Sequence, residues 1–445
     1  MESKAPKQKK QENKIPSQKK LQRELKTLSI TISFFLRHGA NEHNLKMDSE
    51  GYVLVTDLIS CKGLEKATVD LVKHIVATDE KKRYQLKENE NGQLFIRAVQ
   101  GHSIKALDHD AMLTRLTDAS LFTKHNIVHG TFSQFLEPIM QGGLKTMSRN
   151  HIHFAMGYPE EVSHENTQVI SGVRKGCDVY IELDVELALA NGIPIYVSAN
   201  NVVLTEGIMK TLPPLFFKKV FLVNQQGGRD LIFTNQDLVA LRAQHCPRYL
   251  FVLDFEANCI ENDVLNPQEI IEFPVVIVDT VSNQILQDKI FHHYVKPKYF
   301  PLTDFCTKLT GITQAKVDSE GIYLEDVLQR FDEFLKSNKE FASSFAFVTC
   351  GDWDLRTCLR KEAKFKNIEL PSYFTQYINI KDVYATYFDI KGKFGMVQML
   401  KQLKLTLDGH HHSGIDDSKN LAKILTAMLK DPKFLVPKAF IKVIK

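Results

Sequence analysis

The sequence is poor in cysteine and has no long apolar run, and each scarcity excludes a class of protein. Its 445 residues include seven cysteines, none of them in a Cys-x-x-Cys pair. An odd number of scattered thiols argues against a disulfide framework or a structural zinc site and favours reduced thiols in an intracellular protein, cytoplasmic or nuclear. Because no stretch of about 18 apolar residues occurs, we expect no membrane span. Residues 1–26 also lack the apolar segment of a secretory signal.

Positive charge is concentrated at the start of the chain. Residues 1–26 contain nine Lys or Arg and three Glu, a surplus of +6, whereas the whole chain carries +4. Residues 27–445 therefore sum to −2. A flexible basic tail before a nearly neutral body suits salt-sensitive contact with a polyanion such as RNA. A solvated leader without a partner explains the same composition equally well.

The length and the patterning predict several domains of α/β and α+β type. A single hydrophobic core rarely extends over 445 residues. After a disordered tail at 1–27, residues 28–100 combine two apolar helical patterns with a hairpin signal at Asn91-Gly92, which suggests a winged-helix lobe. Residues 101–233 are rich in strand-like runs such as Val179–Leu183, and 234–247 form a helix or linker. Over residues 248–445, strand-like runs such as Val275–Asp279 and Phe345–Thr349 alternate with helical segments, which predicts an α/β domain.

Cationic side chains recur between residues 30 and 175. Arg37 and His38 close an apolar helix, Lys81 and Arg83 share one face as a strand begins, and Arg174 follows a glycine by two residues. Guanidinium groups bind phosphoryl oxygens in a bidentate fork, so this combination favours a phosphate pocket. Each of these residues taken alone is more often a surface ion-pair partner.

Blocks of sequence between residues 28 and 207 resemble the RNA 2'-phosphotransferase family, which acts on spliced tRNA. They read FFLRHGA, DSEGYV, DEKKRYQL, IRAVQGHSI, VHGT, GGLKTMSRNHIHFA, SGVRKGCDVYIELD and ANNVVLTEG, in that order. The resemblance implies a winged-helix lobe that grips RNA and an ADP-ribosyltransferase-like lobe that binds NAD as co-substrate. It also implies a reaction in two steps. An internal RNA 2'-phosphate displaces nicotinamide from NAD, and a neighbouring ribose hydroxyl then takes the phosphate.

The same resemblance assigns roles to individual residues. The residues implied as catalytic are Arg37, His38, Lys81, Arg83 and Arg174. Arg37, His38 and Arg83 would hold and neutralise the attacking phosphate, and Arg174 would favour its transfer in the second step. The residues implied for NAD binding are His129, Gly130 and Thr131, with Arg149 and Ser171 as weaker candidates.

Three local features qualify this assignment. Tyr84 stands where the family usually has Phe, and the Asn before the family's Asp-Lys pair is replaced, which gives Thr78-Asp79-Glu80. Related proteins ADP-ribosylate nucleic-acid ends instead, so the substrate preference stays open. His151 and His153 alternate in a strand-like stretch without a third ligand at suitable spacing. A structural or NAD-lining role is therefore favoured over zinc.

A second group of charged residues lies in the last 200 residues of the chain. Asp254 and Glu256 end the apolar run Tyr249–Leu253, and alternate residues of a strand point the same way. Neighbouring carboxylates repel unless they are protonated or bridged by cations, for which Mg²⁺ or Mn²⁺ is suited. A solvated strand end is the alternative. Two later motifs favour the metal, namely Asp352-Trp353-Asp354 after a second buried-type run and the stretch from His410 to Asn420 as it enters a helix.

The order Asp-x-Glu, Asp, then His with Asp five residues later resembles the DEDD exonucleases of the histidine type. The blocks EIIEFPVVIVD, FCTKLTGIT and WDL are similar to their ERI-like branch, over residues 249–429. The resemblance implies an RNase H-like domain that degrades RNA from 3' to 5'. Two divalent ions about 4 Å apart would be held by Asp254, Glu256, Asp354 and Asp417.

The spacing within the last motif selects its members. His412 lies five residues before Asp417 and would be the general base for the attacking water, in preference to His410 or His411. The same spacing favours Asp417 over Asp416. Asp352 is less favoured than Asp354 because the family's aspartate follows the aromatic residue. Zinc binding by the histidine triplet is disfavoured, since adjacent residues do not easily converge on one ion.

The sequence therefore predicts a bifunctional RNA-processing enzyme. One unit would transfer an internal 2'-phosphate to the ADP-ribose of NAD, and the other would hydrolyse RNA from its 3' end with Mg²⁺ or Mn²⁺. The alternative is an exonuclease whose N-terminal module only binds RNA or ADP-ribosylates nucleic acid. A non-enzymatic adaptor is least favoured, because every catalytic position that can be assigned carries the expected residue type.

Overall fold

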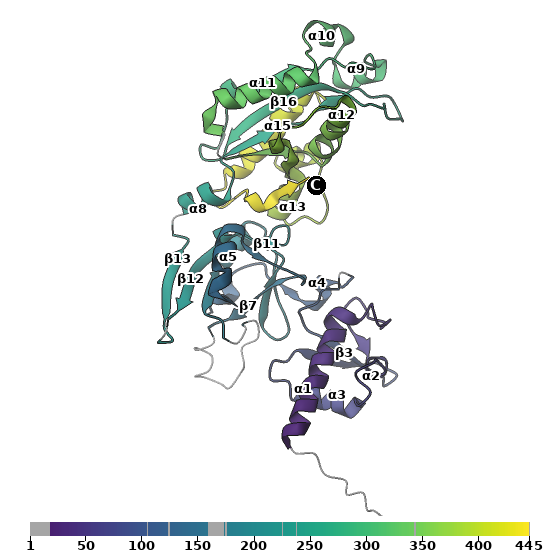
Figure 1. Ribbon diagram of the computed structural model, residues 1–445, viewed down its shortest axis with the longest axis vertical. Coiled ribbons are helices and arrows are strands. Elements are labelled where there is room, and N and C mark those ends of the chain that lie inside the picture. The colour runs from purple at the N-terminus through teal and green to yellow at the C-terminus, as the bar shows by residue number, and fades with distance from the viewer. Residues whose placement is uncertain are drawn as a thin grey trace, which may run out of the picture.

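Three units follow one another along the long axis of the molecule (Figure 1). The computed structural model describes residues 18–104, 106–122, 125–158, 173, 176–224, 226–236, 238–341 and 344–444. The candidates Ser171 and Arg174 and the first 17 residues lie outside this part. Within it, no helix combines the length and apolar character needed to cross a membrane, and all seven cysteines are free.

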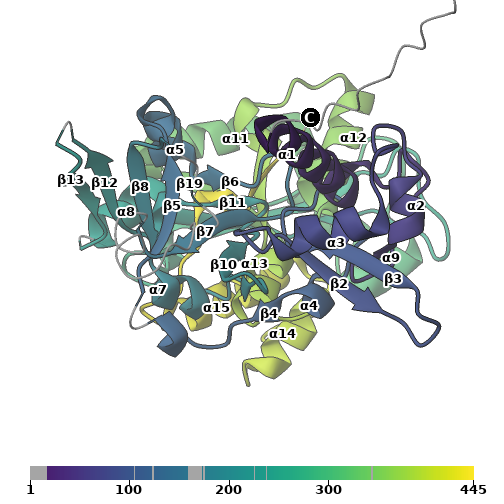
Figure 2. The same cartoon turned by 90° about the horizontal axis from the view of Figure 1, so that it is seen from below.

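The first unit packs three helices against a small antiparallel sheet. Helix α1 (Gln18–Phe34) runs directly into the π-helical turn η1 (Phe35–Gly39). Helices α2 (Val55–Ile59) and α3 (Val69–Ala77) follow, and the sheet has the order β1 (Val53–Leu54), β3 (Leu94–Ala98), β2 (Tyr84–Glu88). In Figure 2, α1, α3, β2 and β3 lie to one side of the larger sheet behind them.

The predicted hairpin is present, but the predicted end of the tail is wrong. Strands β2 and β3 pair from Tyr84 with Ala98 to Glu88 with Leu94, and Gly92 takes a left-handed φ of 74° in the turn. The tail was expected to extend to residue 27, whereas α1 begins at Gln18. Leu25 and Leu28 pack against the core of this unit. Because Lys19, Lys20, Gln22, Arg23 and Glu24 fill most of the positions before Leu25, the short apolar stripe gave only a weak helical signal.

Antiparallel strands dominate the second unit. Its eight-stranded sheet has the order β13 (Arg229–Thr234), β12 (Phe217–Val223), β8 (Val179–Leu183), β5 (Ile127–Thr131), β7 (Ile152–Met156), β10 (Val202–Thr205), β9 (Ile195–Val197) and β4 (Thr114–Arg115). β6 (Leu144–Lys145) pairs separately with β11 (Thr211–Leu212), and the helices are α4 (His109–Met112), α5 (Leu136–Gly142) and α7 (Val185–Ala190). No local pattern in the sequence predicted β12 and β13; β13 is an edge strand with consecutive exposed residues and so shows no alternation.

The third unit is a mixed sheet covered on both faces. Helix α8 (Leu238–His245) leads into β14 (Tyr249–Val252), which runs parallel to β19 (Phe345–Thr349), and β19 runs parallel to β20 (Gln376–Asn379). β16 (Ile270–Asp279) is antiparallel to β14 and also pairs with β15 (Glu256–Ala257), β17 (Gln284–Ile285) and β18 (Phe291–Tyr294). β21 (Ile441–Val443) closes the other edge against β20.

Helices cover both faces of this sheet because alternate residues of β14 point to opposite faces and pack against different helices. Phe251 packs with α11 (Leu324–Ser337) and α12 (Leu359–Lys366), whereas Leu250 and Val252 pack with α13 (Ile380–Tyr387), α14 (Met396–Gln402) and α15 (Gly414–Leu429). Helices α9 (Asp304–Thr310) and α10 (Gln314–Ser319) complete the domain. Strand β16 begins five residues before the predicted start at Val275, because Pro274 and Glu272 in its first half are untypical of a central strand.

The second and third units share one hydrophobic core. Ile193 and Phe216 from the second unit belong to the same buried cluster as Tyr384 and Phe434 from the third. At this boundary Asn191 donates from Nδ2 to the Lys433 carbonyl at 2.8 Å. Its Oδ1 also accepts from the Leu435 amide at 3.0 Å. We call residues 431–438 the C-terminal strap.

Two further contacts tighten this boundary. Gly192 has a φ of 67°, and a side chain there would overlap the carbonyl oxygen of Thr386 in α13. The side chain of Arg115 in β4 pairs with Asp389 just beyond α13. The boundary is therefore a packed interior, which fixes the second and third units against each other.

Candidate active sites

The first candidate site begins at the turn η1, which presents the side chains of Arg37 and His38. The Ser103 amide donates to the Arg37 carbonyl at 3.0 Å, and Ser103 Oγ lies 2.9 Å from His38 Nδ1. Gly101, at a φ of 89°, brings this loop against the guanidinium of Arg37. The polar loop that follows β3 therefore holds Arg37 and His38 in place.

Positive charge is concentrated around Arg37. Burial lowers the pKa of Arg37, and the charges of Arg149 and Arg83 lower it further. The pKa of His38 is lowered by burial and by Arg37 and Arg149, so the ring is largely neutral at pH 7. Among the described residues, the buried Nε and one terminal nitrogen of Arg37 have no hydrogen-bond partner. Such a set fits a phosphoryl group, whose oxygens would satisfy these donors and offset the charge.

Lys81 and Arg83 lie on the approach to β2. The Arg83 side chain pairs with Asp79, whose Oδ2 also accepts from the Arg83 amide at 2.5 Å. The pKa of Lys81 is lowered by burial and then by the charge of Arg83, which indicates that the two cations are close. The structure therefore brings Arg37, His38, Lys81, Arg83 and Arg149 into one cationic group, while Arg174 lies outside the described part.

The residues expected to line an NAD site are on neighbouring strands. His129 Nδ1 donates to the His153 carbonyl at 2.8 Å, which leaves Nε2 of a neutral His129 ring as an acceptor. Burial lowers the pKa of His153 to about 3, and the charge of Arg149 contributes, so His153 is neutral. Its buried Nε2 has no partner among the described residues. A neutral ring with an unused polar atom fits a bound nucleotide better than a free anion.

Two expectations about the residues of the NAD site need qualification. Gly130 was expected to let a ligand approach, but a side chain there would meet Val173 and Cys177 of the protein itself. Thr131 is buried at the end of β5, and its carbonyl accepts from the Asp178 amide at 3.1 Å. Ser171, like Arg174, lies outside the described residues.

The second candidate site is a group of buried carboxylates at the end of β14. Burial raises the pKa of Asp254, and the charges of Asp354, Glu256 and Asp417 raise it further. Burial and the neighbouring charge of Glu272 raise the pKa of Glu256 to about 9. The Phe255 amide donates to Asp354 Oδ1 at 2.9 Å, which links the first strand to the turn after β19. Four carboxylates that oppose one another's ionisation fit divalent cations, which would relieve the repulsion.

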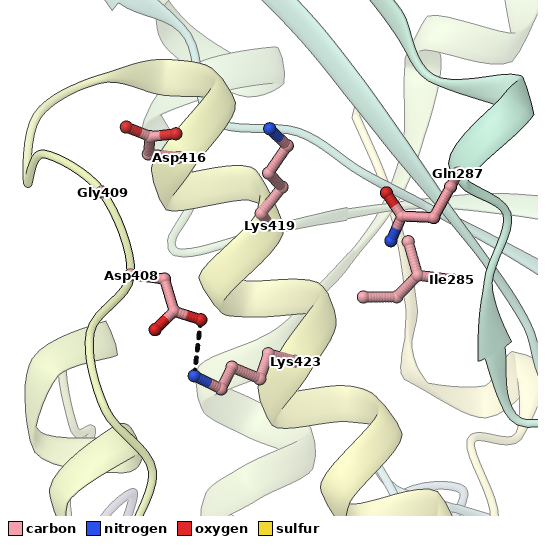
Figure 3. A pocket seen from close by; sticks show the side chains of 7 residues that line it. All are labelled: Ile285, Gln287, Asp408, Gly409, Asp416, Lys419 and Lys423. Carbon is pink, nitrogen blue, oxygen red and sulfur yellow. Dashed lines mark hydrogen bonds and ion pairs between the residues drawn. The ribbon is translucent and has the colours of Figure 1, made fainter.

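The structure distinguishes Asp354 and Asp417 from their alternatives. Asp352 accepts from Lys442 at 2.9 Å and from Asn379 at 3.0 Å, away from the other carboxylates. Asp417 is 2% exposed, whereas Asp416 lines a cavity of about 330 Å³ on the other side of α15. Figure 3 shows this cavity, with Lys419 and Lys423 on the same helix and an ion pair from Lys423 to Asp408.

The histidine loop before α15 is folded around both aspartates. The His410 amide donates to Asp416 at 2.9 Å, and the His412 amide donates to Asp417 at 3.0 Å. The imidazole that reaches Asp417 belongs to His411, at 3.0 Å. The exposed His412 ring stacks on that of His411, with 4.0 Å between centroids. His412 has a φ of 69°, a conformation that leaves its ring free to face solvent.

The rings of this loop lie closer together than the sequence suggests. Adjacent histidines were not expected to converge on one ion, yet donor atoms of His411, His412 and Asp417 all lie within 4.8 Å of one another. Within the described part of the chain, these three residues are the group of His, Cys, Asp or Glu side chains whose donor atoms lie close enough together to hold a metal ion. The left-handed turn at His412 allows it, since it reverses the chain between the two rings.

Sequence reasoning missed two charged residues beside the carboxylates. Lys381, in the first turn of α13, lowers the pKa values of Asp254 and Asp354 and is a fixed cation near them. Glu272 lies within β16 and is 1% exposed. A carboxylate within an otherwise apolar strand is a signal in the sequence, but it gives no indication of the partner.

The raised pKa values predict how pH affects stability. The folded pKa of Glu256 is about 9 against an ordinary 4.5, so the folded chain holds an extra proton between these pH values. Without metal, the free energy of unfolding should therefore fall as pH rises from 4.5 to 9, by up to about 1.4 kcal/mol per pH unit. Mn²⁺ should raise the melting temperature more at pH 8 than at pH 5. Calorimetry in chelator and in Mn²⁺ tests this, and an equally steep fall in the Glu256→Gln variant would contradict it.

Comparison with known proteins divides the chain in two. The model of the RNA 2'-phosphotransferase, Tpt1/KptA family, matches residues 22–207, and an exonuclease family model matches residues 251–425. The tRNA 2'-phosphotransferase 1 of Danio rerio is 37% identical over 194 residues, which cover 43% of this chain and 83% of that protein.

The second half is similar to a different set of proteins. ERI1 exoribonuclease 3 of Homo sapiens is 42% identical over 183 residues, which cover 40% of this chain and 53% of that protein. The chain thus spans about half the length of that relative. A solved nuclease domain of 3'hExo, described as a DEDDh family member bound to rAMP, is 33% identical, with 43% of this chain and 96% of that one covered and a TM-score of 0.40.

Proposed function

The chain belongs to the RNA 2'-phosphotransferase (Tpt1/KptA) family through residues 22–207 and to the DEDDh exonucleases related to ERI1 through residues 251–425, and on that basis we propose that it processes RNA at two active sites. One site removes an internal 2'-phosphate, such as that of a tRNA splice junction. The other hydrolyses RNA from its 3' end. The observation that carries the proposal is the separation of buried charge into a cationic group and a carboxylate group on different units.

At the cationic group, the work is positioning and charge neutralisation. NAD supplies the ribose that accepts the phosphate. Arg37 and Arg83 hold the 2'-phosphate oxygens, and His38, neutral and fixed by Ser103, donates a hydrogen bond without adding charge. No general base is needed to start the reaction, because a phosphate oxygen is already anionic at pH 7. Arg174 then assists the second transfer, as its place in the family motif implies.

At the carboxylate group, the protein supplies oxygen ligands and a base. Asp254, Glu256, Asp354 and Asp417 would hold two divalent ions such as Mg²⁺ or Mn²⁺, whose chemistry would be to activate a water and to stabilise the leaving oxygen. His412 would accept a proton from the attacking water, since its lowered pKa keeps the ring in the basic form at pH 7. The exposure of its ring gives it access to an RNA end.

The assignment is tested with a 5'-labelled RNA oligonucleotide that carries one internal 2'-phosphate. With NAD and chelator, we expect the 2'-phosphate to be lost and the RNA to stay intact, because only the cationic group works without metal. Added Mg²⁺ or Mn²⁺ should then produce a ladder of 3'-shortened products. Retention of the 2'-phosphate, with a normal ladder, would reduce the N-terminal half to an RNA-binding module.

A second candidate function for the N-terminal half is ADP-ribosylation of nucleic-acid ends. The replacement of the family's Asn by Thr78-Asp79-Glu80 favours it, because Asp79 takes up the side chain of Arg83 and so alters the phosphate-binding set. Radiolabelled NAD separates the two functions. Label that stays on the RNA supports ADP-ribosylation, whereas label found only in a small product supports 2'-phosphate removal.

A further inference from the structure

We propose that Glu272 is a positioning residue of the nuclease site, which fixes the start of α15 against the sheet. Glu272 lies in β16, and α15 packs along this strand (Figure 1). Its side chain is 1% exposed in a strand whose residues are all buried. The inference rests on the proposed nuclease function, since its effect is exerted through residues assigned to that site.

Both carboxylate oxygens of Glu272 are engaged. Oε2 accepts from the Gly414 amide at 2.8 Å. Oε1 accepts from the Ile415 amide at 3.4 Å and from His292 Nε2 at 2.8 Å. Each oxygen of Glu272 already accepts at least one hydrogen bond, so the carboxylate is held by α15 and by His292 of β18. It therefore acts on the site through the groups that it holds.

Two of those donors are the first amides of α15. The residue before this helix, Ser413, makes no side-chain hydrogen bond to it. The free amides of a helix start need acceptors, and an anion there is also favoured by the helix dipole. Glu272, which is 142 residues away in sequence, performs this capping from the neighbouring strand. The cap thus ties a helix to the sheet as well as completing its first turn.

The capped turn lies directly against the metal-binding carboxylates. A side chain at Gly414 would come within 2.6 Å of the Asp254 carbonyl and 3.1 Å of Glu272 Oε2, so the helix start fits there only as glycine. Glu272 is also the cross-strand partner of Glu256 in the β15–β16 pair. His412 and Asp417 flank this turn on either side. One buried carboxylate therefore sets the distance between the strand ligands Asp254 and Glu256 and the helix residues His412 and Asp417.

A second buried glutamate, next to the start of β16, offers a matched control. Glu269 is also 1% exposed and precedes β16 by one residue. It pairs with Lys366 at 2.7 Å and accepts from the amides of Lys298 and Tyr299. These partners are structural and none belongs to α15. Loss of Glu269 removes a buried carboxylate without releasing the helix.

The test measures Mn²⁺ binding directly by titration calorimetry of the full chain, together with RNA hydrolysis. Glu272→Ala should weaken Mn²⁺ binding and lower kcat by about ten- to a hundredfold each, with a nearly unchanged KM for RNA, as is typical when a group supporting a metal ligand is removed. Glu272→Gln keeps an acceptor for the Gly414 amide and should restore most of the Mn²⁺ affinity and most of kcat. Glu269→Ala should lower the melting temperature and leave the Mn²⁺ affinity unchanged.

The outcomes separate this role from simple stability. Equal Mn²⁺ affinity in wild type and Glu272→Ala, or equal weakening in Glu269→Ala, would overturn the proposal. If Glu272→Ala does not fold, Glu272→Asp replaces it. Its shorter carboxylate does not reach both amides, so wild-type affinity in that variant would also overturn the role. A wild-type chain that binds Mn²⁺ but cleaves no RNA would refute the nuclease function, and the calorimetric comparison would still decide the role of Glu272.

Discussion

Replacing Asp254 with alanine should abolish RNA hydrolysis and leave 2'-phosphate removal unchanged. Asp254 is central among the carboxylates, since the charges of Asp354, Glu256 and Asp417 all act on it. Its loss removes a shared metal ligand, for which we expect a drop in kcat of at least about a thousandfold. The cationic group lies on other units of the chain and needs no metal. Both activities are measured on one labelled oligonucleotide, and the melting temperature is recorded for each variant.

The matched control for Asp254→Ala is Asp352→Asn. Asp352 is an aspartate of the same domain, but Lys442 and Asn379 engage it away from the site. We expect the Asp352→Asn variant to keep most of the nuclease activity. Loss of both activities in a folded Asp254→Ala chain would show that the two reactions do not use separate sites.

Replacing Arg83 with alanine should have the converse effect, with 2'-phosphate removal reduced by about a hundredfold or more and RNA hydrolysis intact. Arg83 belongs to the group around Arg37, and its guanidinium is already oriented by Asp79. A planar donor that grips two phosphate oxygens is not replaced by an ammonium group, so Arg83→Lys should also lose most of the activity. Release of the 2'-phosphate is followed with NAD in excess and chelator present.

Arg97 provides the comparison for Arg83 within the same unit. Its side chain donates to Gln85 and to the Glu50 carbonyl and lies over the ring of Tyr52, so its contacts are structural. Arg97→Ala should lower the melting temperature more than it lowers phosphate removal. Full phosphate removal by Arg83→Ala would refute the assignment of Arg83 to this site.

The sequence predicted those parts of the fold that local patterns determine. Strands β8 and β19 were predicted with the bounds that they have, because short apolar runs with β-branched residues carry their own signal. The choice of Asp417 over Asp416 rests on local spacing and stays a prediction; Asp417 is buried, whereas Asp416 lines a cavity beside α15. Edge strand β13 and the early start of α1 were missed, because neither buries a continuous stripe.

The contacts that hold the site residues in place could not be predicted from the sequence. The Glu272 contact to α15 joins residues 142 apart, and no local rule selects one distant amide as the partner of a buried carboxylate. The contact of His411 with Asp417 depends on a single left-handed residue, His412, in a loop without a glycine at that position. Ligand types are visible in a sequence, whereas the groups that orient them are determined by tertiary packing.

The shared core and the C-terminal strap also bear on whether the two halves can be separated. Two catalysts joined only by a flexible tether can be separated again by a single recombination event, and each half remains soluble. Here Phe216 and Ile193 of one half are buried with Tyr384 and Phe434 of the other, and Asn191 is held by the backbone of the strap. Separation would expose these apolar surfaces to water and leave the boundary groups unpaired. Removal of either half is therefore expected to lower the stability of the other.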